Sequence, residues 1–347
     1  MNKLFLLLLF LSLFSCKNSH NTTSTEELPC LSRLVVSNPS PETQKVYMFL
    51  CENYGKKIIS GAMANVNWNT NEAEWIYQHT GKYPALNGFD YINHHDTWIY
   101  DTQTYIVENW WNNKGLVSIC WHWSVPKTQG SNQYAFYTNE TSFDISKAAQ
   151  DGTYENGIVK ADLETIAGYL LLLKQKNIPV LWRPLHEAAG GWFWWGAKGA
   201  APLKALWRLM FDTFEAKGLN NLIWVWTAEP NDAAWYPGDE YVDIVGRDIY
   251  NKPTAAAMAS EYTTLKSRFP NKIVTLSECG NVANLSEQTP QDVRWSWFMP
   301  WYDYDRTNNP GSSAFNETAH QHASAAWWNN AFSDPCVLSR DETPNLK

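Results

Sequence analysis

The feature that most constrains the fold is a series of eight short apolar segments separated by longer stretches with helical periodicity. Near-continuous apolar runs are typical of strands that are buried on both faces of a parallel sheet. The alternation of strand and helix indicates βαβ units. The eight predicted strands are residues 57–64, 83–91, 115–123, 178–187, 221–230, 242–250, 272–280 and 293–302.

Eight such units favour a closed barrel over an open sheet. The chain has 347 residues, and barrels of this kind need about 250. An open doubly wound sheet is the alternative. No Gly-rich phosphate loop of the GxGxxG or GxxxxGK[ST] type follows an early strand, which argues against nucleotide binding. We therefore predict an α/β chain in which residues 36–347 form a single (β/α)8 TIM barrel.

The first residues predict export. Residues 1–15 place one Lys before an apolar run that is too short to span a bilayer, as in a signal peptide. Cys16 follows the tripeptide LFS, which resembles a bacterial lipobox. We expect a lipid anchor at Cys16, a flexible tether over residues 16–35, and a place in the bacterial cell envelope, on the outer-membrane surface or facing the periplasm. An ordinary cleaved signal peptide is the alternative.

The remaining cysteines fall into two groups. Export permits disulfide bonds, and Cys30, Cys51 and Cys336 are the candidates, although the sequence leaves their pairing open. Cys120 and Cys279 lie in apolar strand-like runs, so we expect them to be buried free thiols.

The composition is rich in aromatic residues, with 20 Trp and 17 Tyr, and the formal charge is −8. Aromatic faces match the C–H faces of sugar rings, so the composition is compatible with carbohydrate binding. Trp also fills large cores, and this explanation stays open. No basic patch stands out, so nucleic acid is not an expected partner.

Polar residues collect at the carboxyl ends of the predicted strands, where barrels of this type carry their active sites. A carboxylate that ends an apolar run costs free energy unless it is paired or used. We therefore predict the active site at this end. The residues concerned are Asp90, His122, Arg183, His186, Glu187, Glu229, Asp248, Tyr250, Glu278 and Trp301.

Two carboxylates carry the functional prediction. Glu187 and Glu278 end the fourth and seventh strands, on opposite sides of the barrel mouth. Retaining glycosidases use two carboxyl groups about 5–5.5 Å apart, one as nucleophile and one as acid/base. The acid needs a raised pKa, from burial or a neighbouring carboxylate, and hydrogen bonds from Tyr250 or Arg183 would keep the nucleophile ionised. The alternative for either Glu is a salt-bridge partner.

Residues 181–196, LWRPLHEAAGGWFWWG, resemble the acid/base signature of glycoside hydrolase family 26, a β-mannanase-rich family of barrel glycosidases in clan A. Residues 276–278 resemble its nucleophile segment, and residues 121–123 and 248–250 resemble its sugar-contacting positions. The resemblance covers about residues 40–335. It implies a retaining enzyme that cleaves β-1,4-mannosidic bonds in mannan, galactomannan or glucomannan. We expect a monomer that needs no cofactor and no metal.

The resemblance also implies roles for the central residues. Glu187 would protonate the leaving oxygen and then activate water, while Glu278 would attack the anomeric carbon. Tyr250 would donate a hydrogen bond to Glu278. Asp248 would support a sugar hydroxyl or Arg183.

Five more residues complete the expected substrate-binding set. His186 would contact the sugar at the cleavage site and the nucleophile, which requires an irregular strand end because neighbouring side chains alternate; the alternative is a packed residue. His122 would contact the sugar just before the cut, with a core histidine as the alternative. Trp192 and Trp301 would form stacking walls, or else pack in the core. Asp90 is expected to bind substrate as well.

Several other functions remain open. If the long loop after the third strand, residues 124–157, leaves the cleft open, we expect internal cutting. If it closes one end of the cleft, we expect an exo-acting mannobiohydrolase that releases a short product such as mannobiose. Family members also act on β-1,3-xylan or mixed-linkage β-glucan. A surface glycan-binding lipoprotein would explain the Trp content, but it would not need two opposed carboxylates. A metal-dependent hydrolase is disfavoured because His94-His95 are adjacent and His320 and His322, expected in a helical segment, lack i,i+4 ligand spacing.

Overall fold

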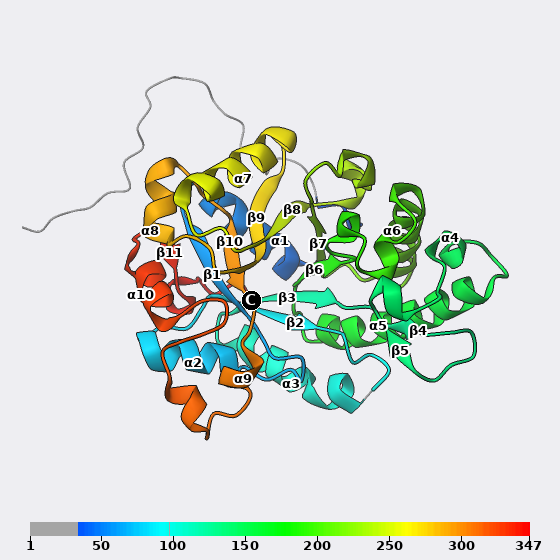
Figure 1. The fold of residues 1–347 in the computed structure, drawn as a ribbon, viewed down its shortest axis with the longest axis horizontal. Helices are drawn as coiled ribbons and strands as arrows, with labels where there is room; N and C mark the ends of the chain where they lie inside the picture. The colour runs from blue at the N-terminus through cyan, green and yellow to red at the C-terminus, as the bar shows by residue number, and fades with distance from the viewer. Residues whose placement is uncertain (1–33, 97) are drawn as a thin grey trace, which may run out of the picture.

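A computed structural model describes residues 34–96 and 98–347, and these form the predicted (β/α)8 barrel (Figure 1). Each barrel strand lies inside one of the eight predicted segments. The barrel strands are β1 (Ile58–Met63), β2 (Leu86–Asp90), β3 (Leu116–Trp121), β6 (Val180–Pro184), β7 (Leu222–Thr227), β8 (Ile244–Tyr250), β9 (Ile273–Gly280) and β10 (Trp297–Pro300).

The sheet closes on itself. The strand order is β10-β9-β8-β7-β6-β3-β2-β1, and β10 also pairs with β1 through the parallel partners Ile59 and Trp297. The short strand β11 (Val337–Leu338) pairs with the start of β1 outside the ring. The open doubly wound alternative is thereby excluded. A small hairpin, β4 (Val125–Pro126) and β5 (Tyr134–Ala135), lies in the loop after β3.

Helices surround the barrel, as Figure 1 shows. Their ends follow ordinary capping chemistry: Ser40 caps the first helix by accepting from the Thr43 N–H, and Thr153 caps the longest helix by accepting from the Asn156 N–H. The helices are α1 (Pro41–Asn53), α2 (Asn71–Thr80), α3 (Trp98–Asn112), α4 (Ile145–Ala148), α5 (Tyr154–Gln175), α6 (Ala200–Ala216), α7 (Ala255–Arg268), α8 (Leu285–Gln288), α9 (Tyr304–Thr307) and α10 (Ala325–Ser333).

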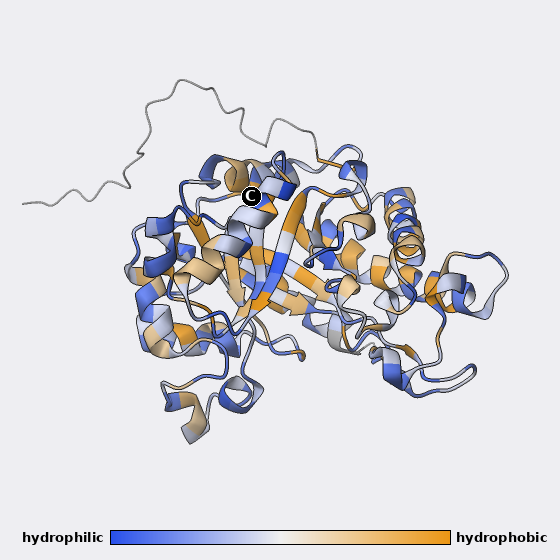
Figure 2. Ribbon diagram, turned by 45° about the horizontal axis from the view of Figure 1, so that its top comes forward, coloured by the Kyte–Doolittle hydropathy of each residue, from blue (hydrophilic) through white to orange (hydrophobic). Residues whose placement is uncertain are grey.

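Most of the tryptophan content serves the core. Figure 2 shows hydrophobic residues concentrated on the central strands and on the helix faces that cover them. Thirteen Trp side chains of the described residues are fully buried, among them Trp182, Trp224 and Trp297 on barrel strands. Packing therefore explains the majority of these residues, whereas Trp192 is 43% exposed and is available to a ligand.

The packed chain begins inside the segment that the sequence predicts as a tether. Leu34 is buried, and the Val35 N–H donates to Oδ1 of Asp243 at 2.8 Å. The predicted signal peptide, Cys16 and Cys30 lie outside the described residues. Within residues 34–347, apart from residue 97, no helix is both long enough and apolar enough to cross a bilayer.

The cysteines divide as predicted. Cys51 and Cys336 are disulfide-bonded. Cys120 and Cys279 are buried free thiols, and burial raises the pKa of each well above its ordinary value. Neither thiol is therefore an ionised nucleophile.

Candidate active site

The fourth barrel strand ends abruptly at the mouth. β6 stops at Pro184, and the backbone is left-handed at Leu185 (φ 49°) and Glu187 (φ 52°). This conformation is uncommon for residues other than Gly and is often retained at functional sites. It interrupts the alternation of side chains, so that His186 and Glu187, although consecutive, both reach the mouth. The irregular strand end that the sequence required is confirmed.

Three carboxylates meet at the mouth. One carboxylate oxygen each from Glu187, Asp248 and Glu278 lies within 4.8 Å of the other two. Glu187 follows β6, while Asp248 and Glu278 are register partners on the neighbouring strands β8 and β9. The two Glu residues that the sequence singled out therefore converge on one point.

Arg183, a fully buried residue of β6, holds two of these carboxylates. Its Nη1 donates to Oδ2 of Asp248 at 2.7 Å, and its Nη2 donates to Oε2 of Glu278 at 2.6 Å. Ser277 donates to the other oxygen of Asp248 at 2.6 Å. The planar guanidinium fork suits two acceptors at once, and such pairing is what makes burial of these charges tolerable.

Tyr250 completes the surroundings of Glu278. Its hydroxyl donates to Oε1 of Glu278 at 2.5 Å, as predicted. Burial raises the pKa of Tyr250 well above its ordinary value, so the phenol keeps its proton and acts as a donor. Both oxygens of Glu278 thus accept from strong donors, which stabilise a negative charge at this position.

The surroundings of Glu187, unlike those of Glu278, favour the protonated form of its carboxyl group. Burial raises its pKa to about 9, and the charges of Asp248 and Glu278 add to the rise. At neutral pH the side chain therefore carries a proton, as a general acid must. The indole Nε1 of Trp192 donates to Oε2 of Glu187 at 3.1 Å and orients the carboxyl group.

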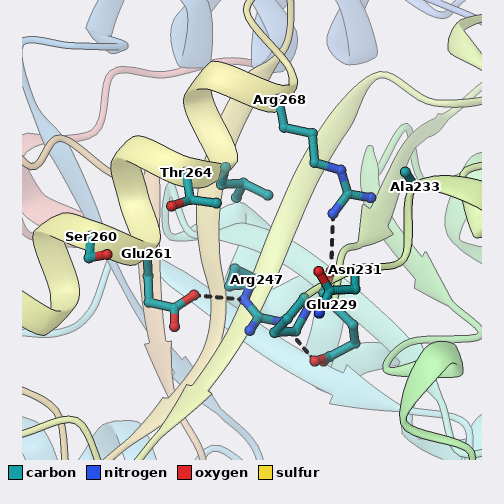
Figure 3. Close-up of a pocket in the computed structure, with 10 residues that line it drawn as sticks. Glu229, Asn231, Ala233, Arg247, Ser260, Glu261, Thr264 and Arg268 are labelled. Carbon is teal, nitrogen blue, oxygen red and sulfur yellow. Dashed lines mark hydrogen bonds and ion pairs between the residues drawn. The ribbon is translucent and has the colours of Figure 1, made fainter.

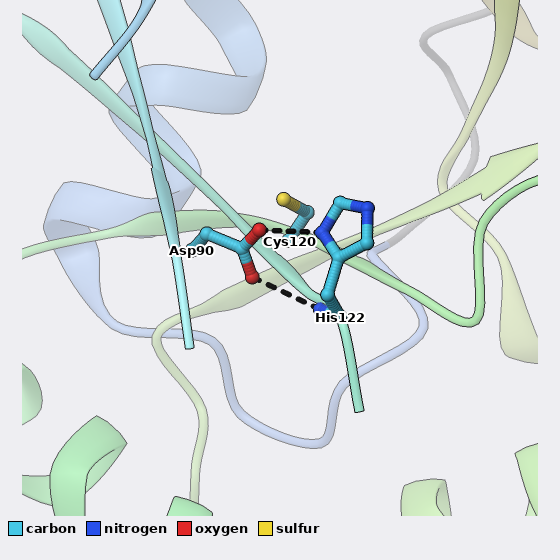
Figure 4. A group of neighbouring side chains, drawn as sticks. All are labelled: Asp90, Cys120 and His122. Carbon is cyan, nitrogen blue, oxygen red and sulfur yellow. Dashed lines mark hydrogen bonds and ion pairs between the residues drawn. The ribbon is translucent and has the colours of Figure 1, made fainter. Parts of the chain in front are cut away.

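Asp90 and His122 form a short hydrogen-bonded pair at the ends of β2 and β3 (Figure 4). Nδ1 of His122 lies 2.5 Å from Oδ2 of Asp90, and the His122 backbone N–H donates to Oδ1 at 2.9 Å. Burial alone would raise the pKa of Asp90 and lower that of His122, but their mutual attraction outweighs burial and reverses both shifts. The pair is therefore ionic. Asp90 is fully buried and supports His122 instead of facing the cleft.

His186 contacts His122, with 3.3 Å between their Nε2 atoms. Burial lowers the pKa of His186 far below its ordinary value, and the charge of His122 lowers it further, so the neutral ring accepts from its charged neighbour. The sequence led us to expect a contact with the nucleophile. Among the hydrogen bonds of the described residues, the His186 ring is joined to His122, and Glu278 accepts from Arg183 and Tyr250 but not from His186.

Aromatic side chains border the mouth. Trp301 is half-buried and lies edge-on to His122, with 5.7 Å between ring centroids. Phe136 and Phe193, which were not among the predicted site residues, also lie edge-on to His122, each at 5.4 Å. Backbone hydrogen bonds join the loop after β3 to the loop after β6, including Trp194 N–H to the Phe136 carbonyl at 3.0 Å. The aromatic residues within 134–137 were the feature of the sequence that could have predicted this contact of the loop with the mouth.

The histidines of the metal-dependent alternative have other partners. The Trp121 indole donates to Nδ1 of His94 at 3.2 Å, and Nε2 of His94 lies 3.6 Å from Asp162. His320 and His322 lie in the loop before α10 and not in a helix, which corrects the expectation, and Nε2 of His320 is 2.7 Å from Glu72.

Glu229, which ends the fifth predicted strand, is held outside the barrel. It lines a cavity of about 400 Å³ beside α7 (Figure 3). Nη1 of Arg247 donates to its carboxylate at 2.7 Å, and Nε of Arg247 donates to Glu261 of α7 at 3.2 Å. This network connects β8 to α7. Glu229 is therefore not one of the three carboxylates that meet at the mouth.

A closed parallel barrel with two facing glutamates at the carboxyl ends of its fourth and seventh strands defines a class of barrel glycoside hydrolases. The family model for glycosyl hydrolase family 26 matches residues 35–341, and the chain belongs to this family.

The chain is similar to several fungal and bacterial proteins. Mannan endo-1,4-β-mannosidase A of Piromyces sp. is 34% identical over 279 residues, which cover 77% of this chain and 45% of that protein. Mannan endo-1,4-β-mannosidase of Thermothelomyces thermophilus is 35% identical over 282 residues, covering 77% and 57%. The chain thus spans about half the length of these curated relatives.

Solved structures show the same fold. The family 26 domain of an endo-β-mannanase/endo-β-glucanase from Prevotella bryantii is 36% identical, with a TM-score of 0.80 and coverage of 89% of this chain and 98% of that domain. A β-mannanase from a symbiotic protist of the termite Reticulitermes speratus, solved with a gluco-manno-oligosaccharide, is 37% identical, with a TM-score of 0.78 and coverage of 90% and 98%.

Proposed function

We propose that this chain is a retaining endo-β-1,4-mannanase, with Glu278 as nucleophile and Glu187 as acid/base. One observation carries the mechanism: carboxylate oxygens of these two residues lie within 4.8 Å of each other. Retaining glycosidases place the two carboxyl groups about 5–5.5 Å apart, whereas inverting enzymes need roughly 6.5–9.5 Å to admit a water molecule.

The first step uses the difference between the two glutamates. Glu278, held by Arg183 and Tyr250, attacks the anomeric carbon as a carboxylate. Glu187, whose pKa is about 9, gives its proton to the leaving glycosidic oxygen. The C–O bond to the leaving sugar breaks, and an ester forms between the glycone and Glu278.

The second step reverses the role of Glu187. Esterification removes the negative charge of Glu278, which is one of the causes that raise the Glu187 pKa. The pKa of Glu187 therefore falls once the ester has formed, and its carboxylate can accept a proton from water. Water attacks the anomeric carbon, and Glu278 is released as a carboxylate.

The mannan assignment rests on the relatives. The fungal relatives named above are mannan endo-1,4-β-mannosidases, and the termite-protist β-mannanase was solved with a gluco-manno-oligosaccharide. We propose linear mannan, galactomannan and glucomannan as substrates, cut internally. Early products from each polymer, compared with β-1,3-xylan and mixed-linkage β-glucan, test this. A ladder of lengths is expected. Mannobiose as the sole early product would indicate an exo-acting enzyme, and turnover of only the other two polymers would exclude mannan.

Substitution of each glutamate tests the mechanism. We expect Glu278→Ala to lose turnover on every substrate and Glu187→Ala to lose about 10²–10⁴-fold on mannan. An aryl glycoside with a good leaving group needs no acid, so Glu187→Ala should still form the glycosyl-enzyme on it. Glu52→Gln, an exposed helix position, is the matched control. Unchanged turnover in either active-site variant contradicts the assignment.

We also propose that the protein is an envelope lipoprotein, anchored through Cys16 and monomeric. The apolar run of residues 1–15 and the following LFS-Cys sequence support the anchor. The disulfide-bonded state of Cys51 and Cys336 supports export. Detergent-phase partition of the full chain should be lost in Cys16→Ser. Partition that persists in this variant argues against the anchor, and light scattering of the detergent-free variant tests the monomer.

A further inference from the structure

His322 lies beside Tyr250 in a loop with no assigned role. The two rings meet edge to face, with centroids 5.7 Å apart and planes at 72°. We propose that His322 is a positioning residue that holds the Tyr250 phenol against Glu278. The proposal rests on the proposed function, since it concerns the group that orients the nucleophile.

A close backbone approach makes this contact possible. Tyr250 and Gly280 are register partners at the ends of β8 and β9. A Cβ atom added at Gly280 would lie 2.5 Å from Nδ1 of His322 and 2.7 Å from Cδ1 of Tyr250. Both rings therefore pack over bare backbone, and any side chain at Gly280 would displace one of them.

The loop that carries His322 is fixed at several points. The His322 carbonyl accepts from the Asn281 N–H at 2.8 Å, which ties it to the end of β9. The Gln321 N–H donates to Asp303 at 2.8 Å. His320, fully buried, pairs with the buried Glu72 of α2 at 2.7 Å. A ring on a loop held this firmly is a fixed surface for its neighbour.

The His322 ring acts here through packing and not through charge. Nδ1 of His322 is buried and has no hydrogen-bond partner among the described residues. Burial lowers the pKa of His322, and His320 lowers it further, so the ring is neutral.

The effect on catalysis follows from the Tyr250–Glu278 hydrogen bond of 2.5 Å. Without the His322 ring, the phenol gains room to rotate, and Glu278 loses one of its two strong donors for part of the time. An ångström of misplacement costs up to roughly 100-fold in rate. We expect His322→Ala to lower kcat about 10-fold, with KM changed less than about 2-fold.

The experiment is a double-mutant cycle on the substrate that the wild type cleaves fastest, with melting temperatures measured for every variant. His322→Ala, Tyr250→Phe and the double variant form the cycle, and His322→Phe restores a flat ring. Gln321→Ala, an exposed neighbour on the same loop, is the control. We expect His322→Phe to recover most of the lost kcat, and His322→Ala to cost less than about 2-fold once the Tyr250 hydroxyl is gone.

Three results would overturn the proposal: wild-type kcat in His322→Ala, the same loss from His322→Ala with or without the Tyr250 hydroxyl, or a loss of kcat in His322→Phe as large as in His322→Ala. Glu278→Ala, measured in parallel, distinguishes a failure of the proposed function from a failure of the positioning role alone. If that variant keeps turnover, the proposed function fails. If it is inactive while His322→Ala matches the wild type, the positioning role alone fails.

Discussion

The indole Nε1 of Trp192 lies 3.1 Å from Oε2 of Glu187, so this residue, which is 43% exposed, both orients the proposed acid/base and borders the mouth. The contact spans only five positions of the chain, and Gly190 and Gly191 lie between the two residues. A Cβ at Gly190 would lie 2.1 Å from the Trp192 ring. The short glycine turn therefore allows the indole to fold back onto the carboxyl group.

Trp192→Phe keeps an aromatic face and removes the donor. A hydrogen bond between neutral groups contributes about 0.5–1.5 kcal/mol, so we expect kcat/KM on mannan to fall about 2- to 10-fold, with an unchanged melting temperature. Trp192→Ala should lose more, because it also removes the exposed aromatic ring at the mouth. Equal activity of Trp192→Phe and the wild type would show that the hydrogen bond does not matter.

The fall of kcat/KM at alkaline pH should reflect the loss of the proton from Glu187. Burial raises its pKa to about 9, and Asp248 is the next cause. kcat/KM should fall as pH rises through about 9, because the acid then loses its proton. Asp248→Asn removes a negative charge, lowers the Glu187 pKa and should move this fall to lower pH. The exposed Asp212→Asn variant should leave it in place. A fall that moves to higher pH in Asp248→Asn contradicts the model.

Glu187→Gln should stabilise the protein increasingly as pH rises. The pKa of Glu187 is near its ordinary 4.5 when unfolded and about 9 when folded. The stability that its protonated form contributes is thus present below about 4.5 and is lost as pH rises towards 9. The neutral amide avoids this loss. Melting scans should show a small difference at pH 5 and a gain of several degrees at pH 8–9. A variant that melts below the wild type at pH 8–9 would show that Glu187 is stabilised as a charge.

Arg183→Lys should be strongly damaging, although the charge is kept. A single ammonium cannot match the fork that joins Asp248 and Glu278 at 2.7 and 2.6 Å. Leaving a buried carboxylate without its partner costs about 3–5 kcal/mol. We expect kcat to fall at least 100-fold and the denaturation midpoint to drop. Arg208→Lys, an exposed position on α6, is the control, and a mild phenotype at position 183 would contradict the bridging role.

Reduction should lower the melting temperature of the wild type. Cys51 of α1 and Cys336, next to β11, are both disulfide-bonded. Removal of a native disulfide costs about 2–5 kcal/mol. Melting scans with and without reductant should therefore differ for the wild type and coincide for the double variant Cys51→Ser/Cys336→Ser. A reductant effect that persists in the double variant would place the sensitivity at other cysteines.

The barrel and the location of its active site at the carboxyl ends of the strands could be predicted from sequence because both depend on the pattern of residues that are close together in the chain. Parallel strands buried on two faces read as apolar runs, and a carboxylate at the end of such a run stands out. Asp90 was also found in this way, but its burial behind His122 was not. The direction of a side chain at a strand end depends on backbone torsion angles that residue type does not set, as at Leu185 and Glu187.

The eight strands, their order, the two glutamates that end the fourth and seventh strands, and the motif around Glu187 were all predictable from sequence. The folded chain alone revealed that Arg183 bridges Asp248 and Glu278, that His186 contacts His122, and that His322 lies against Tyr250. These pairs are separated by 64 to 95 positions along the chain, and His322 comes from a loop without a repeating pattern. Contacts of this kind arise from closure of the barrel, which brings strand ends together whatever their distance in sequence.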